Sequence, residues 1–310
     1  MALYNEQWFI HGVSENVTFL AQQKKSKVMG AMRSKEGVVG KTWPFNRLGA
    51  TSMSQVSRDA ATSYVNPPQS KRRAVLVDFA VAVLIDAFDE VKTLTNPQSE
   101  HAQNIAFARN RTIDDLALGV AGLGTAGASG TAVGGILGLA TNVDEGAEST
   151  STAALPTAQQ IVNGGTGLTM AKLRSAVAII KGADVDFDEE EMYIAYSALA
   201  MKQLMSDATV TSSDYSTIQA LSVGGFPTDA MWMGLKWRLS NRLPSAAANI
   251  RSLPIWAKSA VGYAAAGVKE VETGLDPSHW NNPFVMSKLS AGVVRIDDKG
   301  VVQLDIDESV

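Results

Sequence analysis

The feature that most constrains this chain is a strictly alternating apolar run followed by a long helical run. Residues 74–85, AVLVDFAVAVLI, carry an apolar side chain at every second position, and the side chains between them are mostly apolar as well. This spacing predicts a β-strand that is well buried. Apolar residues at helical spacing then predict a helix over residues 97–121, which begins at Pro97 and ends at glycines. A chain that combines such elements predicts a mixed α+β fold.

The glycines after this helix form the pattern G-x-G-x-x-G, GLGTAG, at residues 122–127. A dinucleotide site needs a strand before these glycines and a helix that begins at them, so that the helix N-terminus meets the pyrophosphate. Here a helix precedes them, and residues 128–154 are rich in Gly, Ser, Thr and Ala. We therefore expect no cofactor and predict a long surface loop. The uncharged run 116–143 is too polar and glycine-rich for a membrane span, so no membrane contact is expected.

Residues of the types that act in catalysis or metal binding are few. The chain has no cysteine, and its three histidines are far apart in the sequence. Neither a serine-hydrolase motif nor a phosphate-binding loop is present. Two pairs of adjacent acids, Asp114–Asp115 and Asp297–Asp298, are interpreted as solvated carboxylates rather than general acids or bases. We expect no catalytic residue, and a structural or binding role is favoured over a hydrolase.

One acidic stretch, ADVDFDEEEMY, resembles the beginning of a calcium-binding loop. Asp184, Asp186 and Asp188 have the right spacing, but Glu189 stands where the loop needs glycine and Ala195 where it needs glutamate. We interpret the stretch as a solvated acidic turn and expect no metal site.

Residues 34–73 predict a long extended hairpin with a polar tip. The run VVGKTWPFNRL alternates in polarity, and glycines and prolines interrupt the segment. A two-stranded hairpin is marginally stable in water unless it packs against something. This segment therefore predicts a contact surface for a partner. The predicted contact residues are Lys41, Trp43, Phe45, Arg47, Lys71, Arg72 and Arg73.

The charge is divided unevenly along the chain. The net charge is −4, yet residues 1–80 hold eleven Lys or Arg against five Asp or Glu, a balance of +6 that leaves −10 for the rest. Such asymmetry indicates an interaction segment, whose partner is either nucleic acid or the acidic part of another copy.

The remaining elements are predicted from periodicity. No signal peptide is expected at the N-terminus. We expect an amphipathic helix at 5–29 and another that begins at Thr169 and ends at Gly182. A short strand is expected at 192–199, followed by a helix through Leu204 and a short helix at 214–224. A single strand is expected at 230–244, with Trp232 and Trp237 on opposite faces. Successive strands are expected over 254–310.

Three blocks, in order along nearly the whole chain, resemble the major capsid proteins of tailed bacteriophages. Residues 84–122 resemble the stretch that leads into the long spine helix of that family. Residues 210–244 resemble its helix-then-strand segment, and GVVRIDDKGVVQLDID at 292–307 resembles its ending.

The resemblance implies the Hong Kong 97-type capsid fold, and with it a division of the chain. Residues 1–33 would be the N-terminal arm, 34–73 the extended E-loop, and 74–122 the strand and spine helix of the P-domain. Residues 123–278 would form the A-domain with its glycine-rich loop, and 279–310 would return to the P-domain.

The implied function is that of a major capsid subunit, which self-assembles into an icosahedral shell around double-stranded DNA. The implied partners are further copies of the chain in hexamers and pentamers, a portal, and DNA contacted non-specifically. Because no long helical extension precedes the arm, a separate scaffolding protein is expected. The implied location is the virion capsid, assembled in the bacterial host cytoplasm. The alternative is a shell protein of a cellular nanocompartment with the same fold.

Overall fold

The structure is a computed structural model in which the chain forms two compact units, described separately below. The first unit comprises residues 1–26, 78–112 and 267–290, and the second comprises the rest, so the boundary falls within one helix and two strands. The residues that the structure describes are 22–58, 61, 64–85, 97–119, 134–143, 151–182, 190–206, 231–247, 249–267 and 271–309.

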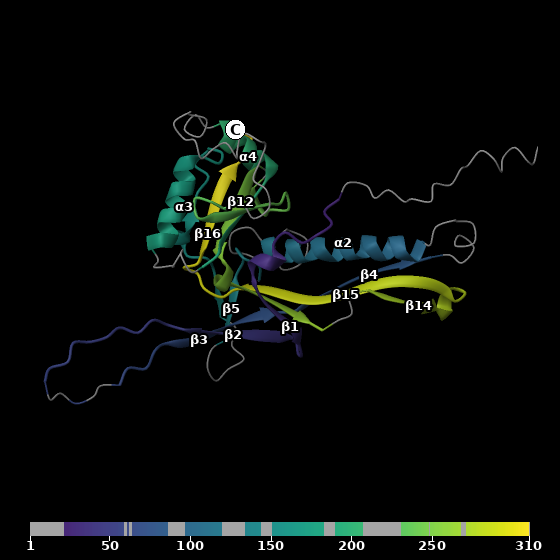
Figure 1. Cartoon of the computed structure of the whole chain (residues 1–310), viewed down its shortest axis with the longest axis horizontal. Helices are drawn as coiled ribbons and strands as arrows, with labels where there is room; N and C mark the ends of the chain where they lie inside the picture. The colour runs from purple at the N-terminus through teal and green to yellow at the C-terminus, as the bar shows by residue number, and fades with distance from the viewer. Residues whose placement is uncertain are drawn as a thin grey trace, which may run out of the picture. The chain divides into compact units, whose positions relative to one another are not determined.

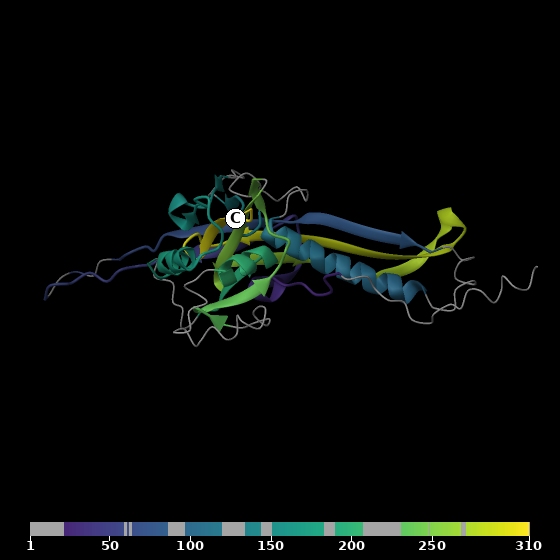
Figure 2. The same cartoon turned by 90° about the horizontal axis from the view of Figure 1, so that it is seen from above.

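The first unit packs a long helix on strands. Strand β15 pairs with both β4 and β14, and helix α2 lies beside β4 and β15 in both views (Figures 1 and 2). Ile105 of α2 is buried against Ile85 and Val285, which joins the helix to the strands. The elements are α2 (Pro97–Leu118), β4 (Val77–Leu84), β14 (Glu272–Asp276) and β15 (Asn282–Arg295). The first residue of β4 and the last residues of α2 and β15 belong to the second unit.

The second unit is built on a seven-stranded sheet in the order β7-β16-β12-β8-β10-β9, with β11 paired to β12. Every residue of β8 is buried, and the fully buried Trp237 and Trp256 pack against Tyr196 and Tyr193 respectively. The strands are β7 (Gln160–Ile161), β8 (Met192–Tyr196), β9 (Met231–Trp232), β10 (Leu235–Leu239), β11 (Ser245–Ala247), β12 (Ile250–Ala257) and β16 (Val301–Asp307). Helix α3 (Met170–Gly182) lies against β16, and α4 is Ala198–Ser206.

Two smaller groups of strands complete this unit. One sheet has the order β2-β3-β5-β6, and β1 pairs in parallel with β13, which pairs with the end of β15. A buried apolar cluster, which includes Phe45, Ala264 and Val294, packs residues from both groups together. The strands are β1 (Arg33–Val38), β2 (Thr42–Leu48), β3 (Gln69–Val75), β5 (Ala140–Val143), β6 (Thr152–Ala153) and β13 (Val261–Ala266).

Most of the regular elements agree with the sequence predictions. Helix α2 covers nearly all of the predicted range 97–121 and ends at Gly119, whose φ of 79° is the left-handed conformation that favours glycine at a helix end. Helices α3 and α4, strand β8 and the C-terminal strands are confirmed as well. The predicted helix at 214–224, the acidic turn and the GLGTAG motif lie outside the described residues.

The predicted helix at 5–29 is wrong for its described end. Residues 22–28 are not helical, and only a 3-10 turn at Met29–Ala31 follows. The backbone N–H groups of Lys27 and Val28 donate to the carboxylate of Asp114 instead. The apolar residues that predicted this helix lie outside the described residues.

The predicted strand at 74–85 is two strands, because the ladder is interrupted at Leu76. Strand β3 ends at Val75 and β4 begins at Val77, while the N–H of Leu76 donates to the carbonyl of Lys41 at 3.0 Å. The expectation of a well-buried strand is also wrong for β4, where most side chains are exposed. Alternation identifies a strand, but it does not show which of its apolar faces another element covers.

The predicted single strand at 230–244 is a tight hairpin of β9 and β10. Met233 and Gly234 both have positive φ, as the two central residues of a type I′ turn require, and Trp232 pairs with Leu235. The turn brings Trp232 and Trp237 together, with ring centroids 5.4 Å apart, rather than placing them on opposite faces.

The predicted surface loop after α2 is wrong for residues 134–143. Ile136 and Leu137 are buried, the N–H of Ile136 donates to the carbonyl of Ala117, and β5 pairs with β3. The glycines of this stretch allow the close approach of backbone that these contacts need. Gly135, for example, has a φ of 76°, and a Cβ on it would meet the Ala117 carbonyl.

Candidate functional site

The hairpin of β2 and β3 extends into a long exposed loop, which makes it the candidate site for binding a partner. The two strands pair antiparallel from Thr42 opposite Val75 to Leu48 opposite Gln69, and the N–H of Gly49 then donates to the carbonyl of Pro68. Beyond this point the chain continues as a long loop (Figure 1). The described residues between 50 and 66 are all exposed.

Apolar side chains are exposed along this distal loop. Met53 is fully exposed, Tyr64 is 92% exposed, and Val56 and Val65 are each 62% exposed. Single exposed apolar residues are ordinary on protein surfaces, whereas several of them on one extended segment form a surface of the kind found at interaction sites. We refer to residues 49–68 as the distal loop.

The base of the hairpin, by contrast, is buried in the chain's own core. Phe45 is 5% exposed and packs over Gly262 of β13, where an added Cβ would lie 2.7 Å from the Phe45 ring. Glycine is therefore required at position 262 for the ring to occupy this place. The apolar contact holds β2 against β13 within the second unit.

A buried ionic network holds β3 at the same base. Arg72, 3% exposed, donates from both terminal nitrogens to the carboxylate of Asp298, at 2.8 and 2.7 Å. It also donates to the carbonyl oxygens of Arg295 and Ile296. Arg295, which is fully buried, donates from Nε to Asp298 at 2.6 Å and from its terminal nitrogens to the carbonyls of Gly138 and Ala153.

The charge balance of this network depends on Asp298. Burial by itself would raise the pKa of Asp298, but the hydrogen bonds from Arg72 and Arg295 outweigh it and lower the pKa below its ordinary value. The carboxylate is therefore ionised near neutral pH and compensates two buried guanidinium groups. Such pairs are costly to break, because removal of one partner leaves an uncompensated buried charge.

The seven predicted contact residues are divided between the interior and the surface. Phe45 and Arg72 are buried in their own chain, so the expectation that the hairpin exposes Phe45 is wrong. The remaining five keep access to solvent: Lys41 and Lys71 are exposed, and Trp43, Arg47 and Arg73 are half-buried.

Two of the half-buried residues have neighbours in their own chain. The ammonium group of Lys35 lies 5.4 Å from the centre of the Trp43 ring, and Arg47 lies 3.8 Å from Asp297. The role of all seven residues in subunit contacts stays a prediction. The sequence did not single out Gly262, Arg295 or the role of Asp298, which depend on contacts between distant segments.

The interpretation of the paired acids as solvated carboxylates is wrong for three of the four. Asp114 and Asp115 are buried, the first bound by backbone N–H groups and the second by Arg242. Asp298 belongs to the network above, and Asp297 is half exposed. Each buried carboxylate is satisfied by partners in its own chain, which is a structural role rather than a catalytic one.

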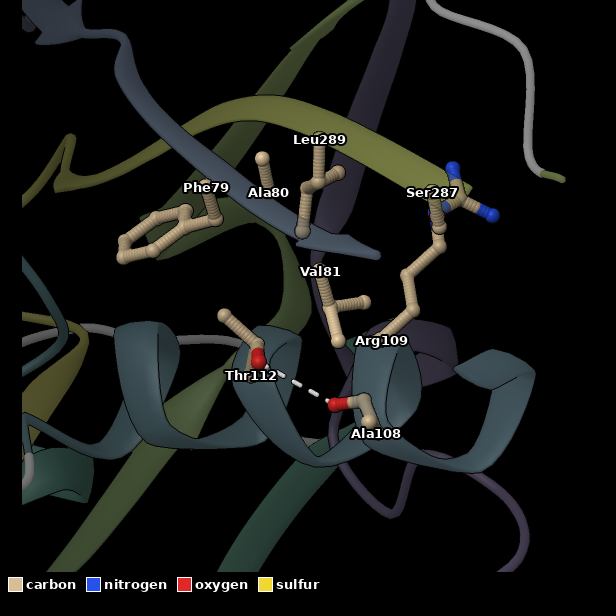
Figure 3. A pocket seen from close by; sticks show the side chains of 8 residues that line it. All are labelled: Phe79, Ala80, Val81, Ala108, Arg109, Thr112, Ser287 and Leu289. Carbon is tan, nitrogen blue, oxygen red and sulfur yellow. Dashed lines mark hydrogen bonds between the residues drawn. The ribbon is translucent and has the colours of Figure 1, made fainter. Parts of the chain in front are cut away.

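One small cleft lies within the first unit. A cleft in the first unit between α2, β4 and β15 has a volume of about 70 Å³, whereas ligand pockets usually measure ~300–1,000 Å³. Figure 3 shows Arg109 reaching from α2 toward Ser287, with Val81 of β4 nearby. Within the described ranges we find no cluster of three or more potential metal ligands and no helix long and apolar enough to cross a membrane.

The sequence matches one family model over almost its whole length. The model describes a phage capsid protein and matches residues 6–308. The chain belongs to the phage capsid protein family. It is accordingly a structural, non-enzymatic protein of the phage capsid, and this membership favours the phage capsid over the cellular nanocompartment. No curated protein sequence matches the chain.

Solved capsid structures share the fold of this family member. The capsid of Ralstonia phage GP4 matches at 11% identity with a TM-score of 0.71, covering 99% of this chain and 97% of that one. The capsid of a native GTA particle matches at 13% identity with a TM-score of 0.68, covering 99% and 98%. The capsid of cyanophage P-SCSP1u matches at 16% identity with a TM-score of 0.64, covering 96% and 93%. The Hong Kong 97-type α+β fold is thereby confirmed.

Proposed function

We propose that the distal loop at residues 49–68 docks on a neighbouring copy of the chain, and that such contacts close an icosahedral shell around the double-stranded DNA of a tailed phage. The observation that carries the proposal is the contrast within one hairpin. Its base is held by Phe45 and Arg72, while its distal loop exposes apolar side chains to water. A partner surface would remove these side chains from water, at about 25 cal/mol for each Å² of apolar area.

The contact is of a kind that builds rings and shells. A projecting segment of one subunit that docks on a different surface of the next is a heterologous contact, and such contacts close into rings when the rotation permits. We therefore retain hexamers and pentamers as the proposed oligomers. The division of the chain into an arm (1–33), E-loop (34–73), P-domain (74–122 and 279–310) and A-domain (123–278) is proposed from the resemblance to the capsid family.

Further partners follow from the family and from the charge of the chain. A separate scaffolding protein and a portal are proposed for assembly in the host cytoplasm, and the packaged DNA is proposed to be contacted without sequence specificity. The positive balance of residues 1–80 is compatible with docking on the acidic remainder of another copy.

Substitutions in the distal loop test the proposal. The double variant Met53→Asp, Tyr64→Asp places charges on two exposed side chains that have little contact with their own subunit. We expect normal circular dichroism and melting temperature, with loss of particles in sedimentation and electron microscopy. Val162→Asp is the matched control, since Val162 is 73% exposed and lies outside the hairpin. Normal particle yield from the double variant would contradict the docking of the distal loop.

A further inference from the structure

The turn that follows β7 contains the only asparagine–glycine pair of the chain. Asn163 and Gly164 lie between β7 and α3, within the second unit. Gly164 and Gly165 have positive φ, 55° and 65°, and the N–H of Thr166 donates to the carbonyl of Asn163 at 3.0 Å. Positive φ at both central residues is typical of a type I′ turn, for which glycine is favoured. We refer to residues 163–166 as the glycine turn.

The carbonyl oxygen of Asn163 receives two further hydrogen bonds. The Thr166 hydroxyl donates to it at 3.0 Å, and the ammonium group of Lys172 on α3 donates to it at 2.7 Å. Lys172, which is half-buried, also donates to the carbonyls of Thr166 and Asp305 at 2.8 and 3.1 Å. Three donor groups, one of them a cation, therefore contact a single carbonyl oxygen.

These donors act on the peptide nitrogen of Gly164. That nitrogen and the Asn163 carbonyl belong to one peptide group, so the negative charge left by loss of the N–H proton is shared with the carbonyl oxygen. Hydrogen bonds to a charged form favour that form, and donors already in place at an oxygen where charge develops stabilise it strongly. The glycine turn therefore favours the deprotonated, nucleophilic form of the Gly164 nitrogen.

The groups on both sides of this peptide bond are accessible. Gly164 is exposed, and a Cβ at this position would have no atom within 4 Å apart from its chain neighbours. Among the described residues, the side-chain amide of Asn163 makes no hydrogen bond. Other asparagine side chains are held by hydrogen bonds, namely those of Asn104, Asn110, Asn142 and Asn241. The Asn163 amide is therefore able to approach the nitrogen of the next residue.

We propose that Asn163 is a site of self-modification by deamidation, and that Lys172 promotes the reaction. The deprotonated nitrogen of Gly164 attacks Cγ of Asn163, so that an N–Cγ bond forms and the Cγ–Nδ2 bond breaks. Ammonia leaves with the proton that the Gly164 nitrogen lost, and a succinimide ring remains. Water then opens the ring. Addition at Cγ gives aspartate, whereas addition at the main-chain carbonyl carbon gives isoaspartate.

The products should change the attachment of the glycine turn to β16. The Thr166 carbonyl accepts the N–H of Asp307 at 3.1 Å, and Lys172 binds the carbonyl of Asp305. Isoaspartate adds a methylene group to the main chain, which displaces the carbonyl of residue 163 from its donors. We therefore expect faster amide hydrogen exchange at the end of β16 in the isoaspartyl form. The reaction takes place within one subunit, so the inference does not depend on the proposed shell.

Incubation of the purified protein in mildly alkaline buffer tests the site. Mass spectrometry of the peptide that contains residues 160–172 should show replacement of an NH group by oxygen at Asn163, and chromatography should separate the aspartyl from the isoaspartyl peptide. The described asparagines with bound side chains should stay largely unmodified. Asn163→Gln should abolish the modification, because attack would then have to close a six-membered ring.

Variants of the donors test how the reaction is promoted. Lys172→Met removes the charged donor and should slow deamidation by about tenfold, the effect of losing one charge-assisted hydrogen bond. Lys172→Arg keeps a cation and should retain most of the rate. Thr166→Val removes a neutral donor and should slow the reaction less. Arg174→Met is the matched control, since it removes an exposed cation of the same helix and should deamidate like the wild type.

Two results would overturn the proposal. The first is an unmodified Asn163 after an incubation in which a synthetic peptide of residues 158–170 is deamidated, because the folded turn would then prevent the reaction. The second is deamidation of Lys172→Met at the wild-type rate or faster, because Lys172 would then be neutral or protective. If Lys172→Met melts below the wild type, Thr166→Val decides in the same way, since Thr166 is exposed and its loss affects only the glycine turn.

Discussion

The two ends of the β2–β3 hairpin lie in opposite environments. At the base, Phe45 packs over Gly262 and Arg72 binds Asp298, so the strands are stabilised by the rest of their own unit. In the distal loop, Met53 and Tyr64 are exposed. The base is stabilised within its own subunit, whereas the exposed distal loop is the part that we propose to contact a neighbouring copy. Substitutions at the two ends should therefore give different defects.

The largest effect on subunit stability is expected from Asp298→Ala. The substitution leaves Arg72 and the fully buried Arg295 without their shared carboxylate, and such a loss usually costs about 3–5 kcal/mol. Denaturant unfolding monitored by circular dichroism measures the change. A matched control is Asp297→Ala, which removes a half-exposed neighbour and should cost less than about 1 kcal/mol. Equal stability of the two variants would show that the network does not hold the base.

Phe45→Ala should destabilise the subunit nearly as much. It removes a buried ring and leaves a cavity beside Gly262, for which about 3–5 kcal/mol is typical. The same unfolding experiment measures it, and Leu48→Ala in the same strand is the control, because Leu48 is exposed. A stable Phe45→Ala subunit that fails only in assembly would place Phe45 in a subunit contact, as the sequence alone predicted, and would break the distinction between base and distal loop.

Acid should weaken the ionic network at the base of the hairpin. The pKa of Asp298 is lowered in the folded state from its ordinary value of 3.8, so this group contributes stability above pH 3.8 that is lost as the pH falls through the folded pKa. We expect the stability difference between wild type and Asp298→Asn to be constant from neutral pH to about pH 5 and to shrink below pH 4. Urea unfolding at several pH values measures it. A difference that is independent of pH down to pH 2 would contradict the assignment.

The smallest effect on stability is expected from reversing exposed charges of the hairpin. Lys41→Glu with Lys71→Glu should change the free energy of unfolding by less than about 1 kcal/mol, because exposed ion pairs are weak. Particle yield should fall more clearly, since the loss is repeated at every subunit contact. Arg72→Glu cannot be used for this purpose, because Arg72 is buried and its reversal would unfold the base.

The same variant distinguishes docking on protein from binding to DNA. If Lys41 and Lys71 contact DNA instead, the double variant should keep its particle yield and lose DNA affinity, with a shallower dependence of affinity on salt. That outcome would show that the exposed lysines of the hairpin bind DNA and that only the apolar side chains of the distal loop contact another subunit.

Elements whose stability depends on nearby residues agreed with the sequence predictions. Helix α2, for instance, has apolar side chains at helical spacing and a glycine at its end, and both are properties of one segment. The hairpin of β9 and β10 was missed because the turn at Met233 and Gly234 interrupts a run that otherwise has the composition of a strand. Gly234 is the sequence signal that could have predicted this turn, since the positive φ of such turns favours glycine.

The sequence by itself determined the positions of several helices and strands, among them α2, α3, α4 and β8, the lack of cysteine chemistry and the kinship to capsid proteins, because these depend on residue types and their order. Only the tertiary structure decided which side chains of those segments are covered. Phe45 and Tyr64 are both aromatic residues of one predicted hairpin, yet the first is buried and the second exposed. The physical reason is that burial depends on what distant segments supply: Gly262 leaves room for the Phe45 ring, and Asp298, more than 220 residues away, neutralises Arg72. Neither contact can be predicted from a local sequence pattern.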